Sequence, residues 1–278
     1  MVQEIDGVKF RMGEPFDFGF LERFGRVFKV FDDQDSGNIC FGTERDGKRY
    51  FVKFAGARTA RCPGEPGEAV ERLKASVPVY RELCHPNLIR LIEAGDMGGG
   101  FGMVFEWALG DCMGRMYPEG HERFMALPLE ARTEVFHRVL DFLEYVHSRG
   151  YLAVDFYDGS IMYDFESGKT TVCDVDFFVK KPYVNDMGRM WGSTIFMSPE
   201  EFRMGAEIDE VTNVYTAGAM AFALLGARKG SYSRERKDWP LGDGLYELAS
   251  RAVSDDRNNR PQSVRELRES WRELENLL

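Results

Sequence analysis

Two acidic segments and one strand lysine carry the side chains that could take part in a reaction. Asp155 stands between Val154 and Phe156 and precedes a tight turn at Asp158-Gly159. An acid that only caps the amides of a solvated turn does not need apolar neighbours on both sides, although capping remains the alternative. We therefore interpret Asp155 as a carboxylate held at a functional site.

Two further acids, Asp174 and Asp176, lie close together in the apolar run 171–178. At the end of a strand, residues two apart point to the same face. Carboxylates placed in this way repel each other and are costly to remove from water unless a cation lies between them. The pattern indicates a divalent cation at Asp174 and Asp176, and the alternative is a pair of surface acids on an edge strand.

Lys53 is the third candidate. It lies in Tyr50-Phe51-Val52-Lys53-Phe54, and strand alternation places its side chain on the face opposite Val52 and Phe54. It either reaches the mouth of a cleft or is a solvated strand lysine. These five residues by themselves favour the solvated lysine.

The elements around Lys53 predict a β-sheet. Short β-branched or aromatic runs, separated by turns that contain glycine, indicate strands at 27–31, 39–44, 49–54, 88–93 and 101–107. Apolar residues from Val70 to Leu83 recur at spacings of three and four, which predicts a helix despite Pro78. The first hundred residues are therefore predicted to form a sheet with one helix.

The hydrophobic period changes in the second half of the chain. One amphipathic helix ends at Arg149-Gly150, an apolar helix that must be buried covers 212–225, and a last amphipathic helix covers 263–278. Strand-like runs at 161–163 and 170–175 interrupt this region. We expect a mainly helical lobe that carries both acidic segments.

Composition limits the partners and the compartment. The 278 residues hold 36 Lys and Arg against 46 Asp and Glu, a net charge of −10, which argues against nucleic acid or an anionic membrane as the main partner. Five cysteines without C-x-x-C spacing indicate neither a zinc site nor a disulfide framework. No basic and apolar leader and no run as long as a membrane span occur, so we expect a soluble, cytoplasmic protein.

In their order and spacing, these segments resemble the eukaryotic-type serine/threonine protein kinase family, including its bacterial members. Lys53 is similar to the lysine of the V-A-I-K motif, His85-Pro86-Asn87-Leu88 to the H-P-N-I run, and 103–107 to the hinge. The run 146–150 resembles the end of the helix before the catalytic loop, which aligns Asp155 with the aspartate of H-R-D.

Three later runs resemble the end of the same domain. The run 192–200 is similar to G-T-x-x-Y-M-A-P-E, 213–218 to D-V-Y-S-L-G, and 256–261 to D-P-x-x-R-P. In the family the arginine of the last motif, here Arg260, pairs with the glutamate that Glu200 matches. We therefore expect a buried or half-buried ion pair between these two residues.

The resemblance implies an α+β, bilobal kinase fold. Its N-lobe, residues 1–107, would hold a five-stranded antiparallel sheet and one helix, and its C-lobe, residues 108–278, would be mainly helical. It also implies ATP and Mg²⁺ as cofactors, transfer of the γ-phosphate to a Ser or Thr hydroxyl, and a protein substrate or partner.

The resemblance assigns a role to each candidate residue. Asp155 is implied as the catalytic base and Lys53 as the catalytic residue on the α- and β-phosphates. Metal ligands are implied at Asp174, Ser160 and Asp176. The other implied nucleotide contacts are Gly37, Glu71, Glu106, Trp107 and Ser160.

The glycine-rich loop departs furthest from the family pattern. Where G-x-G-x-x-G should lie, the chain reads Asp32-Asp33-Gln34-Asp35-Ser36-Gly37. Three carboxylates near a tetra-anion would repel ATP. The loop therefore stays clear of the phosphates, recruits an additional cation, or belongs to a kinase fold that binds without phosphorylating.

The catalytic loop departs at three positions. Val154 replaces the arginine of H-R-D, which reads an activation-loop phosphate, so we expect no ordering of that loop by phosphorylation. Tyr157 replaces the usual lysine, and Ser160 replaces the metal-binding asparagine. A hydroxyl is a poorer ligand than an amide carbonyl, so a second metal site should be weak.

Two alignments remain open. Counting from Gly168 assigns the metal aspartate to Asp174, which we prefer, whereas the other register uses Asp176. The glutamate that should pair with Lys53 is Glu71 when counted forward from Lys53, with Glu68 second. Counting back from His85 reaches Ser76 instead.

Three functions fit these residues. The first is an ATP- and Mg²⁺-dependent protein kinase. The second is a pseudokinase, a nucleotide-binding or scaffolding module, which the lost glycines, Ser160 and Asn213 in place of an aspartate favour. The third is a small-molecule kinase of the aminoglycoside or choline type, which the pair Asp174 and Asp176 favours.

Overall fold

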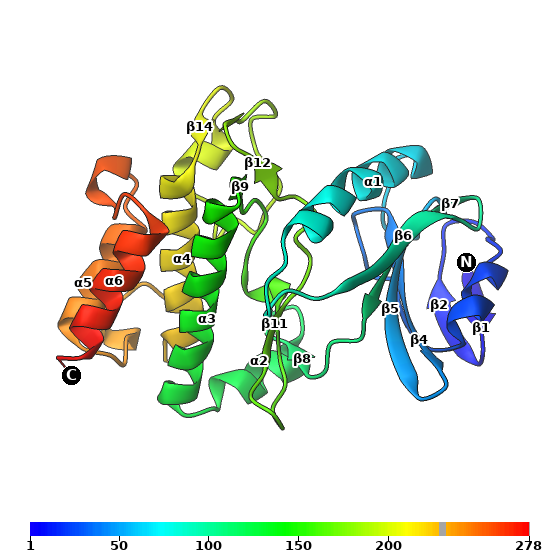
Figure 1. The fold of residues 1–278 in the computed structure, drawn as a ribbon, viewed down its shortest axis with the longest axis horizontal. Helices are drawn as coiled ribbons and strands as arrows, with labels where there is room; N and C mark the ends of the chain where they lie inside the picture. The colour runs from blue at the N-terminus through cyan, green and yellow to red at the C-terminus, as the bar shows by residue number, and fades with distance from the viewer. Residues whose placement is uncertain (228–231, 278) are drawn as a thin grey trace. The chain divides into compact units, whose positions relative to one another are not determined.

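The computed structural model describes residues 1–227 and 232–277, and its contacts divide it into two compact units (Figure 1). The first unit holds Met1–Cys84 and Ile89–Ala108. The second holds His85–Leu88 together with the chain from Leu109 onward. His85–Leu88 joins the second unit because Leu88 forms a parallel bridge with Val172 there, and Asn87 Nδ2 donates to the carbonyl of Thr170 at 2.9 Å.

The first unit is built on a five-stranded antiparallel sheet, as the sequence predicts. The strand order is β3-β4-β5-β7-β6, with strands β3 (Arg26–Phe31), β4 (Asn38–Arg45), β5 (Lys48–Ala55), β7 (Gly100–Glu106) and β6 (Leu91–Met97). Strand β6 starts later than the predicted strand at 88–93, because Leu88 pairs in the second unit. A fold of the predicted class, α+β with one helix packed on this sheet, is confirmed.

That helix, α1 (Pro66–Glu82), continues through Pro78. The ring of Pro78 is exposed, so the missing N–H costs the helix one hydrogen bond without disturbing its buried face. That face carries Ala69, Leu73, Ser76 and Tyr80 toward β5 and β7.

A hairpin precedes the sheet and was not predicted. Its strands are β1 (Val2–Ile5) and β2 (Val8–Arg11), joined at Asp6-Gly7, where both residues have positive φ, 53° and 87°. An Asp-Gly pair between two strands is the usual signal for such a turn. The hairpin and the 3₁₀ turn Gly19–Phe24 pack aromatic residues on the face opposite α1.

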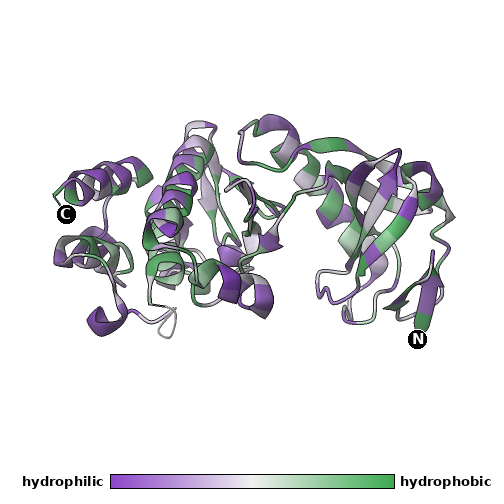
Figure 2. Cartoon of the chain, turned by 90° about the horizontal axis from the view of Figure 1, so that it is seen from below, coloured by the Kyte–Doolittle hydropathy of each residue, from purple (hydrophilic) through white to green (hydrophobic). Residues whose placement is uncertain are grey.

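The second unit is mainly helical, as predicted. Its helices are α2 (Pro118–Met125), α3 (Leu129–Ser148), α4 (Glu210–Leu225), α5 (Asp243–Ala252) and α6 (Val264–Glu275). Fifteen of the 16 residues of α4 are buried, and α3, α5 and α6 pack around it. Figure 2 shows polar and apolar residues mixed around the helix that ends the chain, because α6 buries only one side.

Short strands connect these helices. Strands β8 (Asp111–Cys112), β10 (Ile161–Tyr163) and β11 (Thr170–Val172) form one sheet. Strand β9 (Tyr151–Leu152) pairs with β12 (Val179–Lys180), and β13 (Tyr183–Val184) pairs with β14 (Glu207–Ile208). Short 3₁₀ turns occur at Asp158–Ser160, Pro199–Phe202, Arg236–Asp238 and Arg257–Asn259. Of the helices in the described ranges, none has the length and apolar character needed to cross a membrane.

The predicted ion pair between Glu200 and Arg260 is confirmed and fully buried. Arg260 Nη1 lies 2.7 Å from Glu200 Oε1, with side-chain exposures of 0% and 1%. Thr212 Oγ1 donates to the same carboxylate at 3.1 Å. Burial by itself would raise the pKa of Glu200, but the hydrogen bonds from Arg260 and from the backbone, together with the charges of Arg260 and Arg257, outweigh it and hold this pKa below its ordinary value.

Breaking this pair should destabilise the second unit strongly. We expect Arg260→Gln to lower the free energy of unfolding by about 3–5 kcal/mol, because it leaves a buried carboxylate with only the partly exposed Arg257, 3.7 Å away, as a cation. Arg265→Gln is the matched control: it removes an ion pair whose arginine is 67% exposed, and it should cost at most about 1 kcal/mol. Equal losses in urea denaturation of the two variants would contradict the assignment.

Candidate active site

The backbone before Asp155 is fastened to helix α4 by one buried amide. Asn213 Oδ1 accepts from Ala153 N at 2.8 Å, and Asn213 Nδ2 donates to Ala153 O at 2.7 Å. Asn213 is 1% exposed. Because both bonds go to one peptide residue, the side chain fixes the position of the catalytic-loop backbone two residues before the acid.

Asp155 and Asp174 share an unusual backbone conformation. Both have φ of 55°, in the left-handed region that aspartate tolerates better than most residues. Asp155 is half-buried, and its neighbours Val154 and Phe156 are only 3% and 2% exposed. Residues held in this region are frequent at functional sites, where the surrounding structure compensates the strain.

A narrow pocket opens beside Asp155. Its volume is about 10 Å³, and its lining comes from the catalytic loop, α4 and the run 192–197: Ala153, Asp155, Phe156, Gly192, Ser193, Phe196, Met197, Glu201 and Thr216. This volume accommodates about one group of the size of water. Ser193 and Asp155 thus line a space into which a single hydroxyl could enter.

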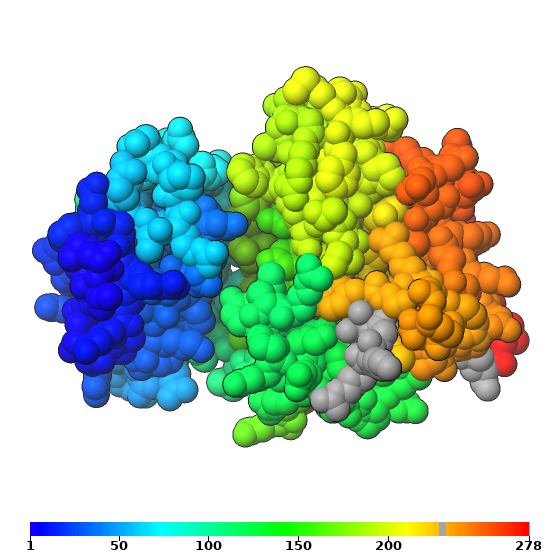
Figure 3. Space-filling model, turned by 180° about the vertical axis from the view of Figure 1, so that it is seen from behind, coloured from blue at the N-terminus to red at the C-terminus, as the bar shows by residue number. Residues whose placement is uncertain are grey.

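The segment from 174 to 200, called the activation segment below, is held partly by apolar packing on the catalytic loop. Val154 clusters with Met190 and Met197 from this segment and with Leu152 and Ile208. Figure 3 shows the segment, in yellow-green, at the surface of the second unit. At position 154, where the family has an arginine that binds a phosphorylated residue of this segment, the chain therefore has a valine in a hydrophobic cluster.

Tyr157 lies between the two acidic segments. Burial, followed by the carboxylates of Asp155 and Asp174, raises the pKa of its hydroxyl, which stays protonated at neutral pH. Its ring covers Gly159, where a Cβ atom would come within 2.2 Å of the ring. Tyr157 therefore places a neutral hydrogen-bond donor near both carboxylates and makes glycine necessary at 159.

Ser160 connects the two acidic segments. Its carbonyl accepts from Cys173 N at 2.7 Å, directly before Asp174. Its side chain is fully buried, and its hydroxyl lies 3.5 Å from Tyr157 N. In this conformation the hydroxyl serves the local turn, and the predicted role of Ser160 as a metal and nucleotide ligand stays a prediction.

Asp174 is exposed and Asp176 is half-buried, while Val175 between them is completely buried. Within residues 1–227 and 232–277, no three His, Cys, Asp or Glu side chains are grouped to hold a metal ion by themselves. The two carboxylates of Asp174 and Asp176 fit Mg²⁺, which is commonly bound by one or two carboxylates with the remaining ligands from water and phosphate.

Lys53 lies in the first unit on the sheet face that α1 covers. It stands opposite Met103 in the β5–β7 register, and directly opposed residues point to the same face. Ser76 Oγ of α1 lies 3.4 Å from Met103 Sδ, which identifies that face. Its neighbours Val52 and Phe54 are fully buried on the other face, as strand alternation requires.

The position of α1 that faces Lys53's strand is Ser76, not Glu71. Ser76 is completely buried, whereas Glu71 is 78% exposed, with its carboxylate 3.9 Å from Lys74 Nζ. Glu68 is also exposed, at 66%. The count back from His85, which reaches Ser76, therefore gives the inward position. The preference for Glu71 is wrong, because Glu71 lies on the solvent side of the helix.

The predicted nucleotide contacts in the hinge are already engaged within the first unit. Glu106 forms an ion pair with Arg90, and its N–H donates to the carbonyl of Arg90 at 3.1 Å. Trp107 N donates to Arg49 O at 3.3 Å, and its ring contacts that of Phe28 edge-on at 5.0 Å. The contact of Glu106 and Trp107 with a nucleotide stays a prediction.

A family model described as the protein kinase domain matches residues 35–271. The chain belongs to the protein kinase family. It is 28% identical over 170 residues to CBL-interacting protein kinase 4 of rice, covering 60% of this chain and 36% of that protein. It is 21% identical over 223 residues to the serine/threonine-protein kinase pkn2 of Myxococcus xanthus, covering 71% and 26%.

A third relative aligns with almost the whole chain. A leaf rust 10 disease-resistance locus receptor-like protein kinase of Arabidopsis thaliana is 22% identical over 277 residues, which covers 94% of this chain and 38% of that protein. The chain thus spans about a third of the length of these curated relatives.

In this kinase the acidic loop before Gly37 is not an uncompensated negative patch. Arg11 of the hairpin lies 3.1 Å from both Asp32 and Asp33, and Arg61 also pairs with Asp33. The hydrogen bond from Arg11 is the main cause that lowers the pKa of Asp32. The expectation that three carboxylates repel ATP is corrected, because two of them are paired with arginines that lie far away in the sequence.

Gly37 has a structural reason of its own. Its φ is +82°, and a Cβ atom there would come within 2.9 Å of Ala69 Cβ and 3.3 Å of Cys62 Sγ. Arg72 Nη2 donates to the carbonyl of Ser36 at 3.0 Å. The glycine therefore lets the loop pack on the start of α1, and its contact with a nucleotide stays a prediction.

Sequence reasoning missed the groups that hold these segments. In the sequence, Asn213 was noted only because it replaces an aspartate of the family pattern. In the structure its side-chain amide bonds to both the N–H and the carbonyl of Ala153. Glu201 was not considered, although it is 3% exposed and accepts from Ser198 N at 2.7 Å and Ser198 Oγ at 2.9 Å. In the sequence, only its place next to Glu200 pointed to a structural role for Glu201.

Replacing the Asn213 amide by a carboxylate should destabilise the kinase in a pH-dependent way. Asn213→Asp keeps an acceptor for Ala153 N but opposes Ala153 O with a second acceptor, at a cost of about 1–3 kcal/mol when ionised. Burial raises the pKa of such an aspartate, so stability is retained at low pH and lost as pH rises.

The control is Asn213→Leu, which removes both hydrogen bonds and should give a loss that is the same at every pH. Urea denaturation from pH 4.5 to 8 compares the two variants. If Asn213→Asp is as stable at pH 8 as the parent, the amide is not needed as a donor.

Glu201 should make stability fall across neutral pH. Burial raises its pKa from 4.5 to about 7. Because the folded-state pKa lies above the unfolded value, its contribution to stability is present below pH 4.5 and lost as pH rises through about 7. Glu201→Gln should therefore gain stability relative to the parent over this range, by about 1–3 kcal/mol at pH 8.

Glutamine still accepts from Ser198, so the variant isolates the charge. Glu166→Gln, an exposed change of the same kind, should leave the pH dependence unaltered. Parallel stability curves for Glu201→Gln and the parent would show that the Glu201 carboxyl titrates normally.

Proposed function

We propose that this protein kinase transfers the γ-phosphate of Mg²⁺-ATP to a Ser or Thr hydroxyl of a protein. The observation that carries the proposal is the pocket shared by Asp155 and Ser193, which admits one hydroxyl-sized group beside a half-buried carboxylate. In this role Asp155 accepts the proton of the attacking hydroxyl as the bond to phosphorus forms.

Lys53 and Asp174 supply the remaining parts in this proposal. Lys53 holds the α- and β-phosphates, as the matching lysine does in the family. Asp174, with Asp176 as second ligand, binds Mg²⁺, which neutralises charge that develops on the phosphoryl oxygens when it is bound. Tyr157 donates a hydrogen bond where other members supply a lysine, so phosphate charge is stabilised less strongly here.

The second candidate is a pseudokinase that binds nucleotide without transferring phosphate. Ser76 favours it, because a buried hydroxyl occupies the inward position of α1 where the family places a glutamate toward the lysine. A serine cannot form the ion pair that holds that lysine on the phosphates.

The test combines ligand-induced stabilisation with transfer. Mg²⁺-ATP at about 100 times its dissociation constant should add about 2.7 kcal/mol of stability. Radiolabelled ATP should label the kinase or dephosphorylated casein, and Asp155→Asn should lower the rate by about 10²-fold or more with little change in nucleotide affinity. Asp186→Asn, an exposed acid of the activation segment, is the control and should retain the rate.

Each result decides between the candidates. Stabilisation with labelling that depends on Asp155 supports transfer. Stabilisation without labelling of any acceptor supports the pseudokinase. An unfolding transition that Mg²⁺-ATP leaves unchanged would overturn both.

A further inference from the structure

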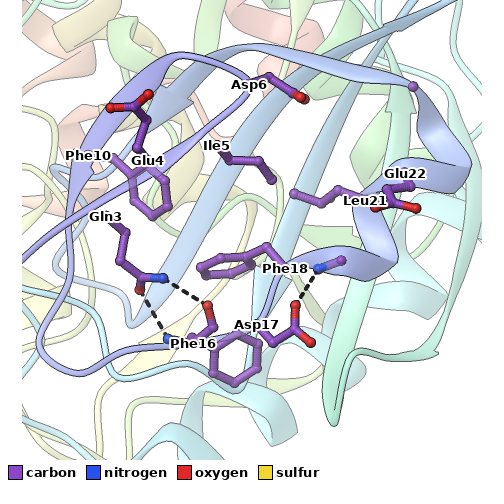
Figure 4. Close-up of a pocket in the computed structure, with 12 residues that line it drawn as sticks. Gln3, Glu4, Ile5, Asp6, Phe10, Phe16, Asp17, Phe18, Leu21 and Glu22 are labelled. Atoms are coloured by element: carbon purple, nitrogen blue, oxygen red, sulfur yellow. Dashed lines mark hydrogen bonds between the residues drawn. The ribbon is translucent and has the colours of Figure 1, made fainter.

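The N-terminal hairpin and the turn Gly19–Phe24 enclose a pocket that lies in residues 3–25, before the matched kinase domain begins at residue 35. Its volume is about 290 Å³, close to the lower end of the range for small-ligand sites. Figure 4 shows the side chains that line it. The proposed phosphotransfer assigns nothing to this part of the chain.

The floor of the pocket is apolar and rigidly packed. Phe10, Phe18 and Leu21 are 3%, 4% and 1% exposed and belong to the core of the first unit. The ring of Phe16 lies 4.9 Å from that of Phe18. One wall is fixed by Gln3, whose side-chain amide exchanges two hydrogen bonds with the backbone of Phe16, at 2.9 and 3.0 Å.

The rim is acidic. Asp6, Asp17 and Glu22 stand at the edge of the apolar floor in Figure 4, and none of the described lining residues is basic. Glu4 lies on the exposed face of the hairpin, opposite Lys9. Asp6 uses one oxygen for Val27 N and Asp17 one for Gly19 N. Over the part of the chain that the structure describes, no salt bridge engages Asp6, Asp17 or Glu22. Arg26 Nη2 lies 3.4 Å from the carbonyl of Asp6 and does not reach its carboxylate.

We infer that this pocket binds a guanidinium or ammonium group carried on an aliphatic stem. The stem would pack on the partly exposed Phe16, and the carboxylates would balance the charge of the cation. An anion or a neutral apolar ligand would leave the acidic rim without a counter-charge. The same chemistry is available from a free organic cation and from an arginine or lysine side chain of a peptide.

The test uses two pairs of isosteric probes, titrated without nucleotide so that the outcome is independent of phosphotransfer. N-Butylguanidinium is compared with neutral N-butylurea, and a Gly/Ala peptide with one central arginine is compared with its citrulline counterpart. NMR shift titrations at low ionic strength measure binding. Each cation should bind at least about tenfold more tightly than its neutral isostere, and added salt should weaken it.

Charge-neutral variants locate the binding. Asp17→Asn combined with Glu22→Gln should weaken cation binding about tenfold, and asparagine still accepts the hydrogen bond from Gly19 N. The control combines Glu166→Gln with Glu273→Gln, two exposed acids of the second unit, and changes net charge equally. This control should bind as tightly as the parent.

Either source of the cation supports the inference, and the tighter of the two cationic probes identifies it. The inference is overturned if neither cation binds, if the neutral isosteres bind equally well, or if the Asp17 and Glu22 variant binds as tightly as the parent.

Discussion

The second unit depends on the buried contact between Glu200 and Arg260. Each charge is almost completely removed from water and is compensated mainly by the other, with Arg257 3.7 Å from Glu200 as a second cation. Arg260 also donates to the carbonyls of Ser254 and Val211. One guanidinium therefore ties the end of the activation segment to the first turn of α4 and to the chain before α6.

The first turn of α4 then organises the catalytic loop. Thr212 bonds to Glu200, and the next residue, Asn213, holds both polar groups of Ala153. Because α4 is buried on nearly all sides, it cannot shift without repacking the unit. The position of Asp155 therefore follows from a rigid helix rather than from the loop's own conformation.

Several charges that the family uses are replaced here by neutral or apolar groups. Val154 packs against Met190 and Met197 where an arginine would bind a phosphate. Such a cluster packs the activation segment on Val154 without a covalent modification. In the first unit the opposite occurs: Asp32 and Asp33 add charge, and Arg11 and Arg61 neutralise it. The apolar cluster around Val154 and the arginine pairs of Asp32 and Asp33 both avoid leaving a charge unpaired beside the backbone.

The residues proposed to carry chemistry could be singled out from the sequence because their motifs are local. Asp155, Asp174 and Lys53 stand in short apolar runs, and strand alternation placed Lys53 on the correct face. The order of strands and helices, and the partnership of Glu200 with Arg260, also followed from motif spacing. These features require only neighbours in the sequence or a family pattern.

Tertiary structure decided what depends on long-range contact. Which residue of α1 faces the sheet is set by the rotation of the helix, and a count that is uncertain by a few residues cannot determine it, so Glu71 was preferred over Ser76. The compensation of Asp33 by Arg11 joins residues 22 positions apart through a hairpin that the sequence did not predict. The acidic pocket of that hairpin likewise exists only where Asp6 and Glu22 are brought to the edge of one apolar floor, because side chains from separate elements form a concave site only after those elements pack.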